Sequence, residues 1–278
     1  MTEYSGRTDP DRILPLLWRR SAPERSGAGR RPRLSVDAVV AAAVGLAGAE
    51  GLAATSMARV AKALGVGTMT LYTYVPSRAE LIDLMVDEVL GELRLPGPGD
   101  ERPAGWRARV ELYAERTRAL YRRHPWLCRV TTVRPPIGPG MLAEREYVLS
   151  TVAGLGLPLH RVDTAATAVS AFVRAAARLE AENAELRRTT GLSTDRWWTQ
   201  RGLLWEDWFD VERHPAMTAL WNAGGFDRGP DEQQEQAHAY GLRLLLDGIE
   251  RDAGTERDAG TGIERDAGVE RDAGVSPA

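Results

Sequence analysis

The sequence predicts an all-α fold with a small N-terminal unit of three helices and a larger helical region after it. Apolar residues recur at helical spacing along most of the chain, and Ser, Gly or Pro stands where those stretches begin or end. The 278 residues, 43% of them hydrophobic, suffice for two packed units. We expect residues 1–34 to form a flexible basic arm, 35–80 the small unit, 81–249 the larger unit and 250–278 a disordered tail.

The first helix of the small unit is predicted between Ser35 and Gly51. Ser35 has the short polar side chain that caps helix N-termini, and Gly51 can adopt the positive φ with which many helices end. The stretch between them presents one apolar face, which consists of Val36, Val39, Val40, Val44 and Ala47.

Two shorter helices follow and are joined at Gly65. We expect Thr55 to cap the first of them, whose apolar stripe is spaced i, i+3, i+4 and i+7. The second is polar, with Leu71 as its main inward residue, so it buries too little to be explained by packing. A helix-turn-helix has this pattern because its first helix braces the second, which reads base edges in the major groove. The apolar stripe is Met57, Val60, Ala61 and Leu64.

A long amphipathic helix is predicted directly after the pair. Pro76 ends the polar helix, and Ser77 with Glu80 has the spacing of a capping box. The apolar residues that follow at helical spacing are Leu81, Leu84, Met85 and Val89.

Residues 52–84, with the core Thr70-Leu71-Tyr72, resemble the tetracycline-repressor (TetR) family of bacterial regulators. Residues 124–127, 134–139 and 241–249 resemble the C-terminal domain of the tetracycline-repressor type. The resemblance implies an all-helical homodimer that binds an inverted-repeat operator in double-stranded DNA. It also implies that a small-molecule effector enters the larger helical domain, which serves ligand binding and dimerisation, and releases the DNA.

The predicted DNA contacts lie on and beside the polar helix. Hydroxyl groups there can meet base or phosphate oxygens, and methyl groups can meet thymine methyls. The helix carries no Arg, Asn or Gln, so we expect methyl contacts and groove shape to supply much of the discrimination. The resemblance places Tyr72 and Tyr74 toward DNA; the alternative is that they pack against the following helix. The predicted contacts are Ser56, Arg59, Thr68, Met69, Thr70, Tyr72, Thr73, Tyr74 and Arg78.

Positive charge gathers before the first helix of the small unit, although the net charge of the chain is −3. Six arginines and one acid lie between Arg19 and Arg33. Such a segment can follow phosphates or enter a minor groove, and we include Arg30, Arg31 and Arg33 among the predicted DNA contacts. The alternative is a solvated leader with no fixed role.

The larger region is predicted to contain helices from Trp106 to Pro125, and over about 141–153, 162–186 and 232–249. Small residues at 164–171 permit close approach of another helix. Each of the last two helices pairing with its copy would form a four-helix interface between two chains. The alternative is that these faces close the core of one chain. The last helix presents Ala237, Tyr240, Gly241, Leu244, Leu245 and Gly248 on one side.

Tryptophans crowd into residues 197–208, and apolar walls of this kind suit a hydrophobic, aromatic effector. The alternative is that these rings belong to the core. Arg174, Arg178 and Glu182 share one helix face, as polar anchors for a ligand or as a solvated ion-pair row. The predicted ligand contacts are Tyr113, Thr117, Trp126, Phe172, Arg174, Trp197, Trp205 and Trp208.

We predict no catalytic residues, cofactor or metal site. The four histidines are far apart in sequence, and neither a His-Glu-x-x-His nor a Gly-x-Ser-x-Gly pattern occurs. Cys128 is the single cysteine, which favours a buried structural thiol over a redox sensor. The alternatives to a ligand-responsive transcriptional repressor are a non-specific nucleic-acid-binding protein that acts through its arm, and a helical enzyme or ligand carrier.

No segment has the length of a membrane span or the apolar region of a secretory signal, so we expect a cytoplasmic protein without a membrane partner. The tail repeats Glu-Arg-Asp-Ala-Gly from Glu250, Glu256, Glu264 and Glu270. This unit is too short and polar to bury a core, which predicts disorder.

Overall fold

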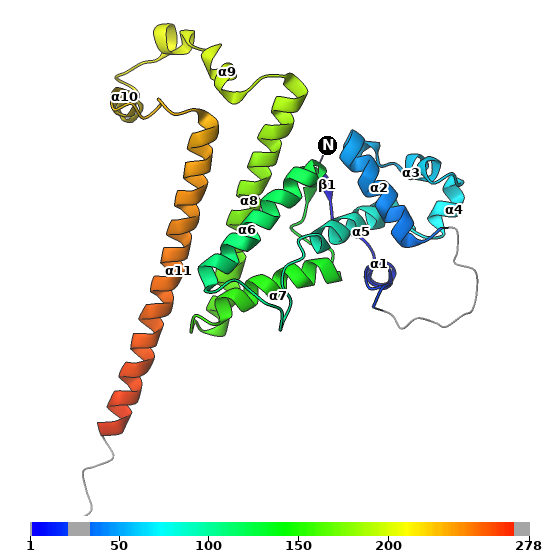
Figure 1. The fold of residues 1–278 in the computed structure, drawn as a ribbon, viewed down its shortest axis with the longest axis horizontal. Coiled ribbons are helices and arrows are strands. Elements are labelled where there is room, and N and C mark those ends of the chain that lie inside the picture. Colours follow the sequence, from blue (N-terminus) through cyan, green and yellow to red (C-terminus); the bar gives the residue numbers. More distant parts are fainter. Residues whose placement is uncertain (1, 22–33, 270–278) are drawn as a thin grey trace, which may run out of the picture. The chain divides into compact units, whose positions relative to one another are not determined.

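The structure, a computed structural model, describes residues 2–21 and 34–269, with side chains as far as residue 254 (Figure 1). The described residues form helices and one pair of two-residue strands, which confirms the predicted all-α fold. Two compact units are present: Met1–Val148 with Val173–Glu185, and Leu149–Phe172 with Leu186–Ala278. The first unit contains the helix-turn-helix together with much of the region that the sequence assigned to a separate domain.

The chain begins with ordered structure in the first unit rather than with the flexible arm expected over residues 1–34. Strand β1 (Glu3–Tyr4) pairs in parallel with β2 (Val130–Thr131), and helix α1 (Pro10–Leu17) follows it. Ile13 and Leu17 are buried in the main apolar core. The expectation was wrong for residues 2–21 because this short apolar helix has a core to pack against. The predicted contacts Arg30, Arg31 and Arg33 lie outside the described residues.

The helix-turn-helix follows the predicted order: α2 (Val36–Glu50), a single 3₁₀ turn, α3 (Met57–Ala63) and α4 (Thr68–Tyr72). Ser35 caps α2 by accepting from the Ala38 amide, and Gly65 between α3 and α4 has a φ of 68°. The cap of α3 is Ser56 rather than the expected Thr55. The Thr55 hydroxyl instead donates to the Leu52 carbonyl oxygen, so the chain turns one residue later than expected.

Helix α5 (Arg78–Gly91) runs through the middle of the first unit and contacts both α1 and α2. The Ser77 hydroxyl caps it by accepting from the Ala79 amide and also donates to the Glu80 carboxylate, a variant of the predicted capping box. The predicted stripe is buried, and so are residues on other faces. The buried residues are Glu80, Leu81, Ile82, Asp83, Leu84, Met85, Val86, Asp87 and Val89.

The first unit is completed by α6 (Trp106–Arg123), a 3₁₀ segment (Pro125–Arg129), α7 (Pro139–Ala153) and the middle of α8 (Leu159–Thr190). Helix α7 starts directly against α5. A Cβ placed on Gly140 would lie 2.1 Å from the Asp87 carbonyl oxygen, so only glycine permits this approach.

The second unit contains α9 (Thr194–Thr199), a π-helical turn (Leu204–Trp208), α10 (Pro215–Asn222) and α11 (Pro230–Val269). The ends of α8 pair with α11 in antiparallel order (Figure 1): Arg161 lies 3.2 Å from Asp252, and Arg187 lies 2.5 Å from Asp231.

Helix α11 continues through the Glu-Arg-Asp-Ala-Gly repeats as far as Val269, although the sequence predicted disorder from residue 250. The start of this segment has tertiary contacts. Asp252 pairs with Arg161 of α8, and Ala253 is buried. The start of the first repeat thus continues a helix that is anchored at Asp252 and Ala253, where the sequence alone predicted disorder. Residues 270–278 lie outside the described residues.

We predict that Gly140→Ala destabilises the first unit by about 1–3 kcal/mol, because the added methyl would overlap the backbone of α5. Gly45→Ala is the matched control: Gly45 lies on the exposed side of α2, and no atom lies within 4 Å of the point that its added methyl would occupy. That substitution should raise stability by about 0.5–1 kcal/mol, since alanine favours helix. Urea denaturation measures both, and equal stability of the two variants would contradict the close approach.

Candidate DNA-binding and effector sites

Helix α4 presents one buried side and several exposed ones. Leu71 is completely buried, whereas Met69 is 78% exposed and Tyr72 is 40% exposed. Thr70 and Thr73 are exposed as well. The helix is thus fixed to the domain through one apolar side chain, and most of its remaining side chains are exposed.

The remaining predicted contacts on and near α4 are less exposed or have partners in the chain. Thr68 is half-buried, and Tyr74 packs against the main core, which favours the alternative interpretation for this tyrosine. The Ser56 hydroxyl accepts from the Arg59 amide. The Arg59 guanidinium pairs at 2.7 Å with Glu50, and both side chains are about half exposed. A phosphate can compete for an arginine in such a solvated pair.

Arg78, another predicted phosphate contact, is bound inside the first unit. Its guanidinium donates to Glu3 at 2.5 Å and to the carbonyl oxygens of Leu52 at 3.1 Å and Thr55 at 3.3 Å. The sequence placed Arg78 at the start of a helix that follows the reading helix, but it gave no sign of β1. In this structure Arg78 therefore joins the chain start to the turn before α3 instead of facing solvent.

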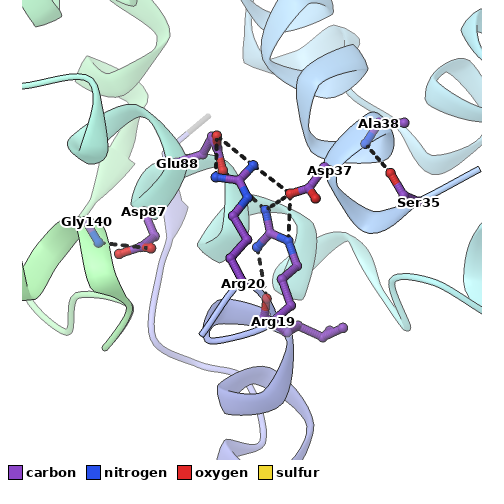
Figure 2. Close-up of polar contacts among 9 residues, drawn as sticks. Arg19, Arg20, Ser35, Asp37, Ala38, Asp87, Glu88 and Gly140 are labelled. Atoms are coloured by element: carbon purple, nitrogen blue, oxygen red, sulfur yellow. Dashed lines mark hydrogen bonds and ion pairs between the residues drawn. The ribbon is translucent and has the colours of Figure 1, made fainter. Parts of the chain in front are cut away.

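Arg19 and Arg20, part of the predicted basic arm, are also engaged within the first unit. Figure 2 shows both guanidinium groups turned toward Asp37 of α2 and Glu88 of α5. Each arginine lies 2.6 Å from Asp37 and 3.2 Å from Glu88. Burial opposes the charge of Asp37, but its hydrogen bonds with Arg19 and Arg20 outweigh burial and hold its pKa below the ordinary value. These two arginines connect α1 to α2 and α5.

Two further carboxylates of α5 bind main-chain groups of neighbouring segments. Asp83 accepts from the Gly6 amide at 2.9 Å and from the Thr8 hydroxyl at 2.7 Å. One turn further along the same face of α5, Asp87 accepts from the Met141 amide and from the Gly140 amide at the start of α7. Figure 2 shows the bond from Gly140. Burial raises the pKa of both carboxyl groups above the ordinary value.

A buried polar cluster lies between α6, α7 and α8. Glu144 is 3% exposed and accepts hydrogen bonds from the Tyr113 hydroxyl at 2.5 Å and from Arg174 at 2.5 and 3.1 Å. Burial opposes the charge of Arg174, but Glu144 outweighs it and raises the arginine pKa. Thr117 donates to the Tyr113 carbonyl oxygen. The structure thus brings together three predicted ligand contacts, Tyr113, Thr117 and Arg174, around a carboxylate that the sequence analysis missed.

A small cavity adjoins this cluster, with a volume of about 20 Å³. That is room for about one water molecule. Its walls come from α5, α6, α7, α8 and the segment that precedes α7; they include Leu90, Leu93, Tyr121, Thr132, Pro135, Glu144 and Arg174. The predicted contact Trp126 is buried in the main core, and its indole N–H has no partner among the described residues.

The other predicted ligand contacts lie in the second unit. Trp205 is the centre of an aromatic group, with ring centroids 5.2 Å from Trp221 and 5.0 Å from Phe209. A cavity of about 570 Å³ is lined by Trp205 and its neighbours. Trp197 instead packs beneath Arg201, Trp208 is 79% exposed, and Phe172 stacks on His238. The eight predicted contacts are therefore divided between the two units; three meet around Glu144, and Trp205 lines the larger cavity.

Arg174, Arg178 and Glu182 on α8 were predicted to be either polar anchors for a ligand or a solvated ion-pair row, and the structure contains both kinds of arrangement. Arg178 and Glu182 form a half-exposed pair at 3.0 Å, as expected for a solvated row. Arg174 turns to Glu144 in the buried cluster. The single face of α8 thus contributes one interior anchor and one surface pair.

Sequence models of known families match most of this architecture. The model of the tetracyclin repressor-like C-terminal domain matches residues 97–253, and that of bacterial regulatory proteins of the tetR family matches residues 39–85. The HTH-type transcriptional repressor DrrR1 of Streptomyces coeruleorubidus is 41% identical over 249 residues, which cover 90% of this chain and 88% of that protein. The chain belongs to the tetR family of bacterial regulatory proteins.

Solved structures of this family share the fold. Apo ActR from Streptomyces coelicolor superposes with a TM-score of 0.65 at 26% identity, over 82% of this chain and all of that chain. ActR in complex with actinorhodin gives a TM-score of 0.64 at the same identity, over 81% of this chain and 100% of that one. The chain is thus a helix-turn-helix transcriptional regulator and not an enzyme, and its α2 to α5 region is the DNA-binding part that the family model covers.

Three further features of the sequence can be located in the structure: possible metal ligands, apolar helices and the single cysteine. Among the described residues, no group of three or more His, Cys, Asp or Glu side chains is arranged to hold a metal ion. None of the helices in this part of the chain is long and apolar enough to cross a membrane. Cys128 is buried, and its thiol lies 3.7 Å from the Arg178 carbonyl oxygen.

We predict that Cys128 resists alkylation in the native protein. Burial raises its pKa to about 11, whereas an unfolded cysteine titrates near about 8.5, so the thiolate is scarce at pH 8. Iodoacetamide at pH 8 should react about a hundredfold more slowly without urea than with it. Because the pKa of Cys128 is higher in the folded protein than in the unfolded one, the thiol contributes fully to the free energy of unfolding below about pH 8.5. This contribution is lost as the pH rises toward 11. Equal labelling rates with and without urea would contradict a buried thiol.

Proposed function

We propose that this regulator is a repressor that binds an inverted-repeat operator as a homodimer and leaves it when a small hydrophobic effector binds. The observation that carries the DNA-binding assignment is the exposure of α4, with Leu71 buried and Met69 78% exposed. A helix that buries a single large side chain gains little from packing. Its exposed face is therefore best explained by a partner that it contacts.

The homodimer is supported by an exposed apolar row on α11. Tyr240 is 56% exposed and Leu244 is 49% exposed, and small residues flank them on the same side. Exposed large apolar side chains at helical spacing are typical of a helix that packs against another chain. Two chains related by a two-fold axis would present two copies of α4 to DNA, which requires an inverted repeat. The row is Ala237, Tyr240, Leu244 and Gly248.

The chemistry of α4 favours recognition by methyl contacts and groove shape. Met69 and the methyl groups of Thr70 and Thr73 can meet thymine methyls, while Tyr72 can reach a phosphate. The Thr73 hydroxyl donates to the Thr70 carbonyl oxygen, so it remains available to DNA as an acceptor. Arg59, in its solvated pair with Glu50, supplies a further phosphate contact.

We place the effector at the Tyr113–Glu144–Arg174 cluster. A buried ion pair inside a helix bundle offers the few polar anchors that orient an otherwise hydrophobic ligand. The cavity beside it holds about 20 Å³, so the effector must separate its walls. One wall is α5, which also carries Asp83 and Glu88 and packs against α2. Ligand entry thereby favours a conformation in which α2 to α4 are displaced.

The second place for an effector is the cavity of about 570 Å³ around Trp205. Its size is within the usual range for small-molecule sites, and its walls include Trp198, Trp221 and Phe226. This site would give a role to Trp205, which the sequence analysis named, whereas Trp197 and Trp208 do not line the cavity.

The first prediction here concerns the operator. Thr70→Ala combined with Tyr72→Phe should weaken binding to an inverted repeat about tenfold or more, because a base-facing hydroxyl and methyl and a phosphate contact are lost. Fluorescence anisotropy against the inverted repeat upstream of the protein's own coding region measures this. Val211→Ala, a change at a 56% exposed side chain outside the DNA-binding part, is the control. Unchanged affinity of the double variant, or equal wild-type affinity for scrambled DNA, would refute the assignment.

The second concerns the effector, with actinorhodin as the probe. Tyr113→Phe removes one donor to Glu144 and should raise the probe concentration that releases the operator about tenfold. Trp205→Leu disrupts the other cavity and should leave release unchanged. The opposite pattern would move the effector site to the tryptophan cavity. No binding of actinorhodin in isothermal titration would show that the effector belongs to a different chemical class.

A further inference from the structure

The ordered chain start, residues 2–21, is here named the N-terminal strap. One side of the strap is bound to the segment that precedes α7. The Ser5 amide donates to the Thr131 carbonyl oxygen at 3.1 Å, and the Ser5 hydroxyl donates to the Arg134 carbonyl oxygen at 2.9 Å. Further along, the Trp18 indole N–H donates to the Ile137 carbonyl oxygen at 2.9 Å. The strap is thus bound to this segment near its beginning and near its end.

Close packing supports these bonds. A Cβ on Gly6 would lie 2.2 Å from the Arg134 carbonyl oxygen, and the φ of Gly6 is +65°. Only glycine combines this backbone conformation with this contact. Ile13 and Leu17 of α1 are buried in the main core, so the helix that connects the two ends of the strap is itself held in place.

The other end of the strap reaches the DNA-binding part. Arg19 and Arg20 both bind Asp37, in the first turn of α2, and both bind Glu88 on α5 (Figure 2). The Arg19 side chain is only 16% exposed, so its pairs are less screened than ordinary surface pairs. The position of the start of α2 therefore depends in part on where α1 ends.

The segment that holds the strap is also a wall of the cavity beside Glu144. Thr132 and Pro135 line that cavity. The carbonyl groups that bind the strap belong to their neighbours Thr131, Arg134 and Ile137. Within one short segment, some residues face the cavity and the backbone of others holds the strap. A ligand that pushes Thr132 and Pro135 outward must also move the acceptors of the strap.

We infer that the N-terminal strap couples this cavity to α2, with Trp18 and the Arg19–Arg20 pair as its two coupling points. This inference rests on the proposed effector site. With the cavity closed, the strap holds α2 in the position that binds DNA; an occupied cavity displaces the segment from Thr131 to Ile137 and releases that hold. The strap acts in addition to α5, which forms another wall of the cavity and contacts α2 directly. The strap residues are positioning residues and do not touch DNA or effector.

The test compares three variants of the full chain. Trp18→Phe keeps an aromatic ring but removes the bond to Ile137, and Arg19→Gln with Arg20→Gln removes the charges at the other end. Arg12→Gln is the control, because Arg12 lies on α1 within the strap and, among the described residues, pairs only with Asp9 at 3.8 Å. For each variant we measure the operator Kd with and without saturating actinorhodin, and the melting temperature.

We expect Trp18→Phe and the double variant each to weaken operator binding without effector about threefold to tenfold, as expected for one lost hydrogen bond or ion-pair network. The factor by which actinorhodin raises the operator Kd should be about threefold to tenfold smaller in these variants than in the wild type. The melting temperature should change little for Trp18→Phe, so that a general loss of stability does not explain the result. Arg12→Gln should match the wild type. If Trp18→Phe matches Arg12→Gln in both Kd values, the inference is overturned.

Hydrogen exchange of the free protein tests the coupling without operator or effector. The hydrogen bond of Trp18 goes to Ile137 and not to α2, yet Trp18→Phe should speed amide exchange in the first turns of α2 about threefold. The double variant removes ion pairs that go to Asp37 and Glu88, and it should speed exchange in residues 130–137. Exchange changes confined to each variant's own contacts would overturn the inference. A wild-type protein that binds no inverted repeat but shows this reciprocal pattern would instead refute the proposed function and leave the strap intact.

Discussion

The arrangement of the DNA-binding part depends on the acidic side chains of α5. Asp83 binds the strap, Asp87 binds the first amides of α7, and Glu88 binds the two arginines that reach α2. Asp83 and Asp87 are four residues apart and largely buried, so each is costly unless its oxygens are bound. Main-chain amides bind both. The same helix therefore holds the chain start, the start of α7 and the helix-turn-helix through directional bonds, and apolar packing alone would not fix these three positions so closely.

The cavity beside Glu144 has a different character, since it places a buried ion pair next to a small void. A buried ion pair gains from the low dielectric of the interior but loses hydration, so its net contribution to stability is small. Polar atoms that stay bound and a cavity for about one water leave room for rearrangement at little cost. A ligand with apolar rings and a few polar groups can fill the enlarged space and still leave Arg174 and Glu144 paired. This makes the cluster better suited to a switch than to a stabilising core.

The sequence predicted the helices well because their signals are local. Ser35, Gly51 and Ser77 mark helix ends through their own backbone preferences, and Leu71 is the one apolar residue that can fix α4. The strap was missed because its order comes from partners more than 60 residues away, Asp83 and Thr131 among them. For the same reason, Arg78 was assigned to DNA although Glu3 binds it. One signal was present: Asp83 and Asp87 stand within a run that is apolar on nearly every side, where an acid needs a partner in the chain.

The composition of α4 makes the inferred coupling between the cavity beside Glu144 and α2 important. A helix that carries bidentate base readers can tolerate some displacement, because each strong contact can re-form. Helix α4 has threonines, a methionine and a tyrosine instead, so its affinity depends on many weak contacts that must all be in register. In the proposed homodimer, the two copies of α4 would lose binding when the distance between them changes by a small amount. Control through the position of α2, by the strap and by α5, then requires little motion and little energy, which is within reach of a small ligand.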